Sequence, residues 1–170
     1  MKKGAVILIL CLVCLCIAVP AAVMLSTVIE GDDGLIEKAR QEIPIADADT
    51  IELVIVGKVT DGDEELVWFK SGNEYQYNRY TPMEFAILGD DKYRFGKTYN
   101  PIDRGDRISV VYWHDNFVVL VDNPDCTAIQ IISADGFEEV IPVEEIPFVY
   151  STRIFSGEYN FVDAEGNILH

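Results

Sequence analysis

Cysteine is almost absent from the part of the chain that could form a folded domain. Three of the four cysteines, Cys11, Cys14 and Cys16, lie inside an apolar run near the N-terminus, and only Cys126 lies beyond it. A single cysteine cannot form a disulfide within its own domain. A lipoprotein signal needs a small residue directly before the cysteine, and none of the three has one. We therefore expect neither a disulfide nor a lipid-modified cysteine.

Histidine is equally scarce, with only His114 and His170 in the sequence. Cysteine–histidine catalysis needs the two side chains within hydrogen-bond reach, but the strand expected between His114 and Cys126 would hold them about 16 Å or more apart. The chain also lacks the Gly-x-Ser-x-Gly turn of many serine hydrolases and the cysteine and histidine sets of common zinc sites. The sequence therefore predicts no catalytic residue, no cofactor and no metal ligand, and favours a protein that is not an enzyme.

Positive charge is also in short supply. The chain carries 13 lysine and arginine residues against 29 aspartate and glutamate residues, which gives a net charge of −16. Such a field repels nucleic acids and anionic lipid headgroups. Nucleic acid is therefore excluded as a partner. The acidity favours solubility, and its alternative role is to attract cations or a basic partner.

A long uncharged segment is present near the N-terminus. It runs over 26 residues from Gly4 to Ile29, with Lys2 and Lys3 before it and Glu30 directly after it. About 20 apolar residues in a helix span the hydrocarbon core of a bilayer. Basic residues on one flank and acidic residues on the other predict a cytoplasmic N-terminus. We expect a signal anchor over residues 4–29, with residues 1–3 in the cytoplasm and the rest outside the cell membrane.

The alternative is a cleaved signal peptide that ends near residue 21. Pro20 would break the helix after an apolar core over residues 5–19, and the small residues around Ala21 suit signal peptidase. The protein would then be secreted. Apolar residues continue beyond Pro20 as far as Ile29, and this continuation favours the retained anchor.

The remainder of the chain has the pattern of an all-β domain. Turn signals recur about every ten residues between Asp47 and the C-terminus, with short runs of β-branched and aromatic residues between them. We expect residues 47–170 to form an extracytoplasmic antiparallel β-sandwich of the immunoglobulin-like kind, with a small β-barrel as the alternative. Residues 30–46 are expected to form a juxtamembrane linker with a short helix of one or two turns, because Asp33 and Glu37 resemble a helix-start box.

Four local elements follow from the pattern. Residues 51–60 are mostly apolar, more continuously than an edge strand would be, which predicts a central strand. Short turns rich in Asp, Asn and Gly predict three hairpins, which pair residues 107–113 with 117–121, residues 127–132 with 137–143, and residues 159–162 with 168–169.

Aromatic residues are concentrated between positions 68 and 99. Tyr75 and Tyr77 are two residues apart and would share one face of a strand, which Trp68 could join from a neighbouring strand. The three side chains would then form a flat platform for a ligand such as a sugar. The alternative is ordinary cross-strand packing of aromatic residues, and this alternative is the favoured one.

Carboxylates cluster at the expected turns. Two facing acids could support glycoside hydrolysis, and residues 61–65 could hold calcium at a loop, although solvated loop tips explain both patterns. The tripeptide over residues 104–106 is Arg-Gly-Asp, which matches adhesion sequences at three positions only.

The sequence thus predicts a membrane-anchored extracytoplasmic β-domain that binds or scaffolds at the cell envelope without catalysis. Expected partners are the lipid bilayer, through the N-terminal helix, and an envelope protein or cell-wall polymer. The alternative is an extracytoplasmic glycan hydrolase that uses carboxylates.

Overall fold

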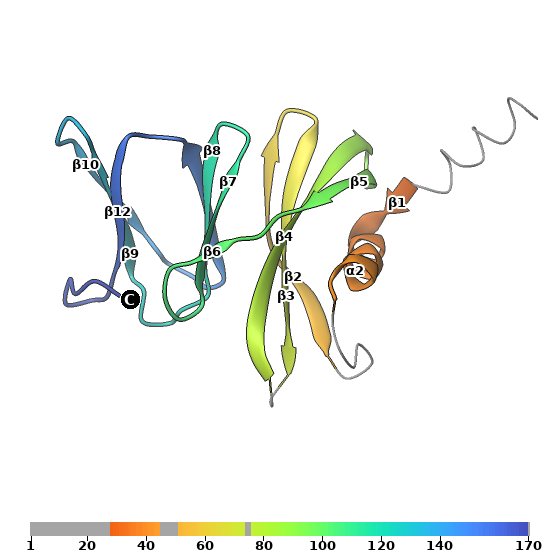
Figure 1. Cartoon of the computed structure of the whole chain (residues 1–170), viewed down its shortest axis with the longest axis horizontal. Helices are drawn as coiled ribbons and strands as arrows, with labels where there is room; N and C mark the ends of the chain where they lie inside the picture. The colour runs from red at the N-terminus through yellow and green to blue at the C-terminus, as the bar shows by residue number, and fades with distance from the viewer. Residues whose placement is uncertain (1–27, 45–50, 74–75, 170) are drawn as a thin grey trace, which may run out of the picture.

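The structure is a computed structural model that describes residues 28–44, 51–73 and 76–169. One helix and three antiparallel sheets are stacked in four layers (Figure 1). The prediction of an antiparallel all-β fold is confirmed, and the sheets face one another as in a sandwich. Residues 4–27 of the predicted membrane segment lie outside the described residues. Its last two residues, Val28 and Ile29, belong instead to a strand that pairs within a sheet, which corrects the predicted end of the segment. Among the residues that are described, no helix has the length and apolarity needed to cross a bilayer.

The sheet next to the helix, named here the helix-side sheet, has five strands in the order β1-β5-β4-β3-β2. Tight turns join β2 to β3 and β4 to β5, and Gly62 and Asp91 adopt the positive φ that such turns favour. Four of the five strands therefore form a simple meander. Their bounds are Val28–Glu30 for β1, Glu52–Asp61 for β2, Glu64–Asn73 for β3, Gln76–Gly89 for β4 and Lys92–Thr98 for β5.

Helix α2 (Gly31–Glu42) covers one face of this sheet. Asp32 in its first turn and Arg40 in its last turn match the polarity of the helix dipole. Leu35 and Ala39, four residues apart on one face, are fully buried against the strands. The helix is longer than the one or two turns expected. Together with β1 it makes the expected linker a packed part of the folded domain.

Strand β2 corrects a prediction, because it lies at the edge of its sheet and not at the centre. Its continuous apolarity instead reflects burial on both faces. Leu53 and Ile55 pack toward α2, whereas Val56 packs toward the next sheet, with a bulge between Ile55 and Gly57. Gly57 permits a close approach of that sheet, since a Cβ there would lie 2.2 Å from a methyl carbon of Val149.

The remaining strands form a middle sheet in the order β11-β8-β7-β6 and an outer sheet in the order β10-β9-β12. The first two predicted hairpins are confirmed as β7–β8 and β9–β10. The third is reduced to one bridge between Val162 and Ile168. The bounds are Ile102–Asp103 for β6, Ile108–Trp113 for β7, Asn116–Val121 for β8, Ala128–Ser133 for β9, Glu138–Pro142 for β10, Phe148–Arg153 for β11 and Gly157–Val162 for β12.

Three apolar clusters fill the spaces between the four layers. Trp68 and Phe69 show how one strand serves two of them, because they are adjacent in β3, point to opposite faces and are both fully buried. An immunoglobulin-like sandwich has two sheets around one core. This chain differs, since its third sheet adds a second sheet–sheet core and its described sheets are built mainly from meander connections.

Candidate functional site

Of the three residues considered for an aromatic platform, Trp68 follows the favoured alternative, which is packing in the core. Trp68 is fully buried between the helix-side and middle sheets, so its ring is not accessible to a ligand at the surface. Tyr75 and the side chain of Tyr77 lie outside the described part of the structure. Their participation in a binding surface therefore stays a prediction.

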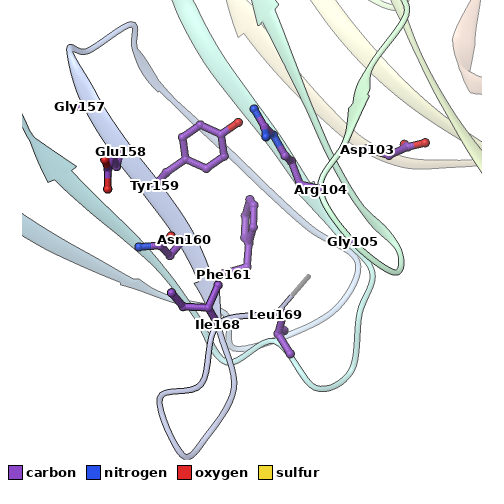
Figure 2. A pocket seen from close by; sticks show the side chains of 10 residues that line it. All are labelled: Asp103, Arg104, Gly105, Gly157, Glu158, Tyr159, Asn160, Phe161, Ile168 and Leu169. Carbon is purple, nitrogen blue, oxygen red and sulfur yellow. The ribbon is translucent and has the colours of Figure 1, made fainter.

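An open cleft of about 660 Å³ lies between the edges of the middle and outer sheets (Figure 2). Residues 157–161 of β12 form one wall, and residues 103–105, at the end of β6, form the other. Ile168 and Leu169, close to the C-terminus, also line it. Of these positions only residues 104 and 105 were singled out from the sequence, as part of an Arg-Gly-Asp tripeptide. The cleft itself was not predicted, because it exists only through the relative placement of two sheets.

The main chain of β12 is partly unpaired along this cleft. β12 is the last strand of the outer sheet and pairs with β9 on its inner side. Its outer side is paired near its end, where the carbonyl oxygen of Phe161 accepts a hydrogen bond from the backbone of Leu169. Backbone groups of a strand alternate between its two sides, so the N–H and C=O of Tyr159 face the same side as those of Phe161. Among the described strands none pairs with Tyr159 on that side.

Side chains in the cleft combine one cation with two acids. The guanidinium of Arg104 lies 5.2 Å from the centre of the Tyr159 ring, which is a cation–π distance. Asp103 and Glu158 also line the cleft, and the Tyr159 hydroxyl points toward Arg104 (Figure 2). Arg104, the first residue of the Arg-Gly-Asp tripeptide, is therefore a wall of this cleft.

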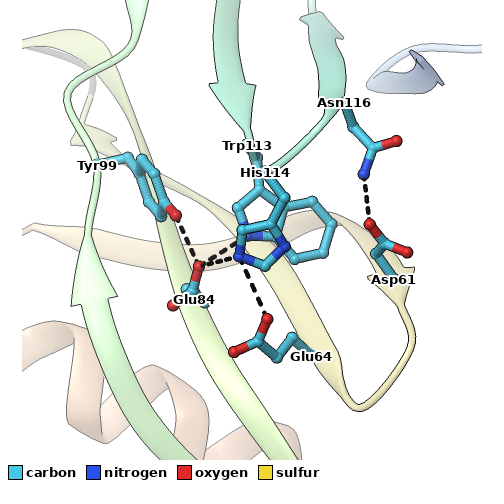
Figure 3. A network of polar contacts seen from close by, with 7 residues as sticks. All are labelled: Asp61, Glu64, Glu84, Tyr99, Trp113, His114 and Asn116. Atoms are coloured by element: carbon cyan, nitrogen blue, oxygen red, sulfur yellow. Dashed lines mark hydrogen bonds and ion pairs between the residues drawn. The ribbon is translucent and has the colours of Figure 1, made fainter. Parts of the chain in front are cut away.

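A polar network joins the helix-side and middle sheets around Glu84 (Figure 3). Glu84, on β4, is only 8% exposed, and its Oε2 accepts hydrogen bonds from the Tyr99 hydroxyl at 2.6 Å and the Trp113 indole at 2.8 Å. Burial by itself would raise the pKa of Glu84. Hydrogen bonds from Tyr99 and Trp113, with the charges of Lys97 and His114, outweigh burial, so this pKa lies below its ordinary value.

The lowered pKa bears on the glycan hydrolase alternative. A glycosidase needs one carboxyl group that stays protonated as the general acid, with a raised pKa. Glu84 is the most buried acid in this cluster, and it is held in the ionised form instead. The network therefore offers no support for acid catalysis by Glu84.

His114 occupies the two-residue turn between β7 and β8 with a φ of 51°. Its ring stacks on Trp113 with 4.8 Å between centres. Its Nε2 lies 3.1 Å from Oε2 of Glu84 and 3.2 Å from Oε2 of Glu64. The sequence did not predict this grouping, because β3, β4 and the turn meet only through packing of two sheets. One signal was present, since histidine is unusual in a turn position that favours asparagine or glycine.

Three acids of the loop that was considered for calcium, residues 61–65, are engaged with other protein groups. Asp61 Oδ2 accepts a hydrogen bond from the Asn116 amide at 2.7 Å, Glu64 faces His114, and Glu65 lies 3.7 Å from the Lys58 ammonium. Within the described residues, the loop acids do not form a three-carboxylate group of the kind that could hold an ion. The calcium hypothesis gains no support from this arrangement.

Cys126 and His114 lie beyond opposite ends of β8, as the sequence predicted. Cys126 is buried, and burial raises the pKa of its thiol. A thiol is inert toward electrophiles when it stays protonated. Cys126 is therefore a core residue of the space between the middle and outer sheets.

Comparison of the chain with protein-family models, with curated proteins and with solved structures gives no match. Its function is therefore inferred from its own geometry.

Proposed function

We propose that the protein is a membrane-tethered, non-catalytic binding module on the outer side of the cell membrane. In this proposal the cleft beside β12 takes up an extended segment of a partner polypeptide, which adds to the outer sheet as a further strand. Peptide recognition by strand addition draws its affinity from main-chain hydrogen bonds and its specificity from side-chain pockets.

The observation that carries the proposal is the free side of β12 along the open cleft. Proteins normally protect exposed strand edges with charges, bulges or covering segments. Within the described part of the chain, Ile168 and Leu169 cover this edge only at Val162 and Phe161. The stretch from Gly157 to Asn160 lies beside about 660 Å³ of open space, which gives room for a strand and its side chains.

Charge suggests the chemistry of the partner. The chain has a net charge of −16, and Asp103 and Glu158 both line the cleft. A segment with basic residues would be drawn to this surface, and electrostatic complementarity mainly raises the association rate. Arg104, which lies over Tyr159, would be available to pair with an acidic residue or a main-chain carbonyl of the partner.

The position of β1 sets where the tether of this proposal would end. β1 begins at Val28, inside the stretch from Gly4 to Ile29 that the sequence assigns to the anchor. An anchor that ends there would join the sheet without a flexible linker and hold the helix side of the domain near the bilayer. The cleft lies in the two layers farthest from β1 (Figure 1), where a partner would meet no steric hindrance from the membrane.

Site-specific photo-crosslinking in native envelopes tests the cleft. A photoreactive residue replaces Asn160 in the full chain, and the matched control carries it at Glu139, an exposed position on β10 at the opposite edge of the outer sheet. We expect one crosslinked polypeptide from position 160, with the crosslink in an extended basic segment, and a lower yield in high salt. Equal yields at both positions, or no crosslinked product, would refute the proposal.

Protease accessibility tests the tether separately. Protease added to intact cells should degrade the domain, whereas a cytoplasmic control protein survives until lysis. Survival of the domain in intact cells would place it on the inner side of the membrane.

A further inference from the structure

Glu64, Glu84 and His114 bring three potential metal ligands together at one end of the interface between the helix-side and middle sheets (Figure 3). One carboxylate oxygen from each glutamate and one ring nitrogen of His114 lie within 4.8 Å of one another. We propose that this group, the Glu64–Glu84–His114 cluster, binds a divalent transition-metal ion, and that zinc is the ion that fits it best. The inference is independent of the peptide cleft.

The spacing of the atoms matches a coordination shell. Zinc bonds of about 2.0–2.2 Å at tetrahedral angles separate neighbouring ligand atoms by about 3.3 Å. His114 Nε2 lies 3.1 Å from a Glu84 oxygen and 3.2 Å from a Glu64 oxygen. Two of the three distances between ligand atoms are therefore close to the value that zinc requires. Only the distance between the two carboxylate oxygens would need to change when an ion binds.

The number of hydrogens that His114 can donate to the two carboxylates also favours a bound ion. Nε2 of a histidine carries at most one hydrogen, yet it faces carboxylate oxygens of both Glu64 and Glu84. That hydrogen can form one good bond, which leaves the other carboxylate without a donor from the ring. Oε2 of Glu84 already accepts hydrogen bonds from Tyr99 and Trp113. Glu64 is therefore the carboxylate that gains most from a cation, which would also accept the lone pair of the ring nitrogen.

The donor types select among ions. Imidazole nitrogen suits zinc, copper, iron and nickel, whereas calcium takes six to eight oxygens and magnesium keeps an octahedral oxygen shell. Three protein ligands leave one zinc position for water or for a group of a partner. The cluster therefore has the ligand count of an open zinc site.

The surroundings fit an accessible and supported site. The side chains of Glu64 and His114 are 42% and 33% exposed, which gives an ion a path from solvent, while that of Glu84 is 10% exposed at the base. Tyr99 and Trp113 hold the Glu84 carboxylate in place, as outer-shell partners do for metal ligands. The net charge of −16 raises the local concentration of cations.

Isothermal titration calorimetry of the full chain in detergent tests the site. The protein is stripped with a chelator and titrated with zinc chloride at pH 7.5. The variants are His114→Asn, which keeps a residue type that tolerates positive φ, and Glu64→Gln. Loss of an outer-shell partner already costs about 10- to 100-fold in metal affinity. We therefore expect one zinc ion per wild-type chain and an affinity at least about 10-fold lower in each variant.

Matched controls separate coordination from general electrostatics. Asp115→Asn removes the same charge as Glu64→Gln from an adjacent turn position, where the side chain is 90% exposed, and should keep the wild-type affinity. His170→Asn removes the other histidine and should do the same. The proposal is overturned if the wild type binds no zinc at equimolar ratio, if His114→Asn and Glu64→Gln bind as tightly as wild type, or if Asp115→Asn weakens binding equally.

A measurement on the wild type alone keeps the test independent of folding in the variants. Nitrogen chemical shifts of the histidine rings are recorded by NMR before and after addition of one equivalent of zinc. Coordination should move a ring nitrogen of His114 and leave His170 unchanged. Unchanged His114 shifts would contradict the proposal.

Discussion

Two polar clusters join the same pair of sheets at opposite ends of β8, and they differ in how completely their charges are matched. At one end Asp122 accepts hydrogen bonds from the Lys70 ammonium at 2.7 Å and the Tyr80 hydroxyl at 2.6 Å. At the other end lies the Glu64–Glu84–His114 cluster. The first has one carboxylate for one ammonium, and the second has two carboxylates for one imidazole.

The two clusters also differ in how far their side chains are buried. Asp122 and Tyr80 are each 6% exposed, so the carboxylate and the hydroxyl of their cluster are closed to solvent, whereas the side chain of Lys70 is 29% exposed. Glu64 and His114 are reachable from solvent. A closed cluster with matched charges serves stability, because buried polar groups cost free energy unless they are paired. An open cluster with excess negative charge has capacity for a ligand, which is the basis for the proposed zinc site.

The largest expected effect is at the closed cluster. Asp122→Ala leaves a Lys70 ammonium and a buried Tyr80 hydroxyl without their acceptor, and should lower the free energy of unfolding by about 3 kcal/mol. Urea unfolding of the full chain in detergent measures the change. Asp125→Ala, at an exposed neighbouring position, should stay within about 0.5 kcal/mol of wild type. Similar losses in both variants would mean that the Asp122 contacts contribute nothing specific.

A second effect is expected at Gly57, where β2 closely approaches β11 of the middle sheet. Gly57→Ala would place a Cβ 2.2 Å from a Val149 methyl carbon and should destabilise the chain by about 1–3 kcal/mol, because valine is too stiff to move aside. Val149→Ala in the same chain should recover part of this loss. No recovery in the double variant would show that the sheets do not meet at this point.

A third expected effect concerns pH. Burial, followed by the hydrogen bond to Asp122, raises the pKa of Tyr80, and the charges of Asp122, Lys70, Arg107 and Asp106 face this hydroxyl. A raised pKa means that the folded state holds this proton more tightly than the unfolded state. The stabilisation is complete below about pH 10, the ordinary tyrosine value, and is lost as pH rises above it.

The variant Tyr80→Phe has no such proton. Its free energy of unfolding, measured in urea between pH 8 and 11, should therefore fall less steeply above about pH 10 than that of wild type. Parallel curves for the two proteins would contradict the role assigned to Tyr80.

The sequence predicted local elements of the fold but not the contacts between sheets that form the two clusters. Turn residues predicted the β7–β8 and β9–β10 hairpins because their partners are close in sequence. Apolarity predicted β2 as a strand, but edge and centre look alike when both faces are covered. The approach of Glu84 to His114 depends on how two sheets pack, and no local pattern encodes that packing. The burial of Trp68 agrees with the favoured packing alternative, but the sheet that covers it could not be predicted, for the same reason.

The smallest expected effect is at the open cluster in the absence of metal. Glu64→Gln removes a partly exposed charge next to His114 and should change the free energy of unfolding by no more than about 0.5 kcal/mol. Urea unfolding of a chelator-treated sample measures it. If Glu64→Gln lowered the free energy of unfolding as much as Asp122→Ala does, both clusters would serve stability in the same way.

The most direct test of the distinction is urea unfolding of wild type, Asp122→Ala and Glu64→Gln, each with and without zinc. An ion that binds only the folded state stabilises it by about 2.7 kcal/mol when its free concentration is a hundred times the dissociation constant. We predict that gain for wild type and for Asp122→Ala, and no more than about 1.4 kcal/mol for Glu64→Gln, whose affinity is expected to be at least about 10-fold lower. Zinc that leaves wild type unchanged, or that stabilises Glu64→Gln as much as wild type, would contradict the account.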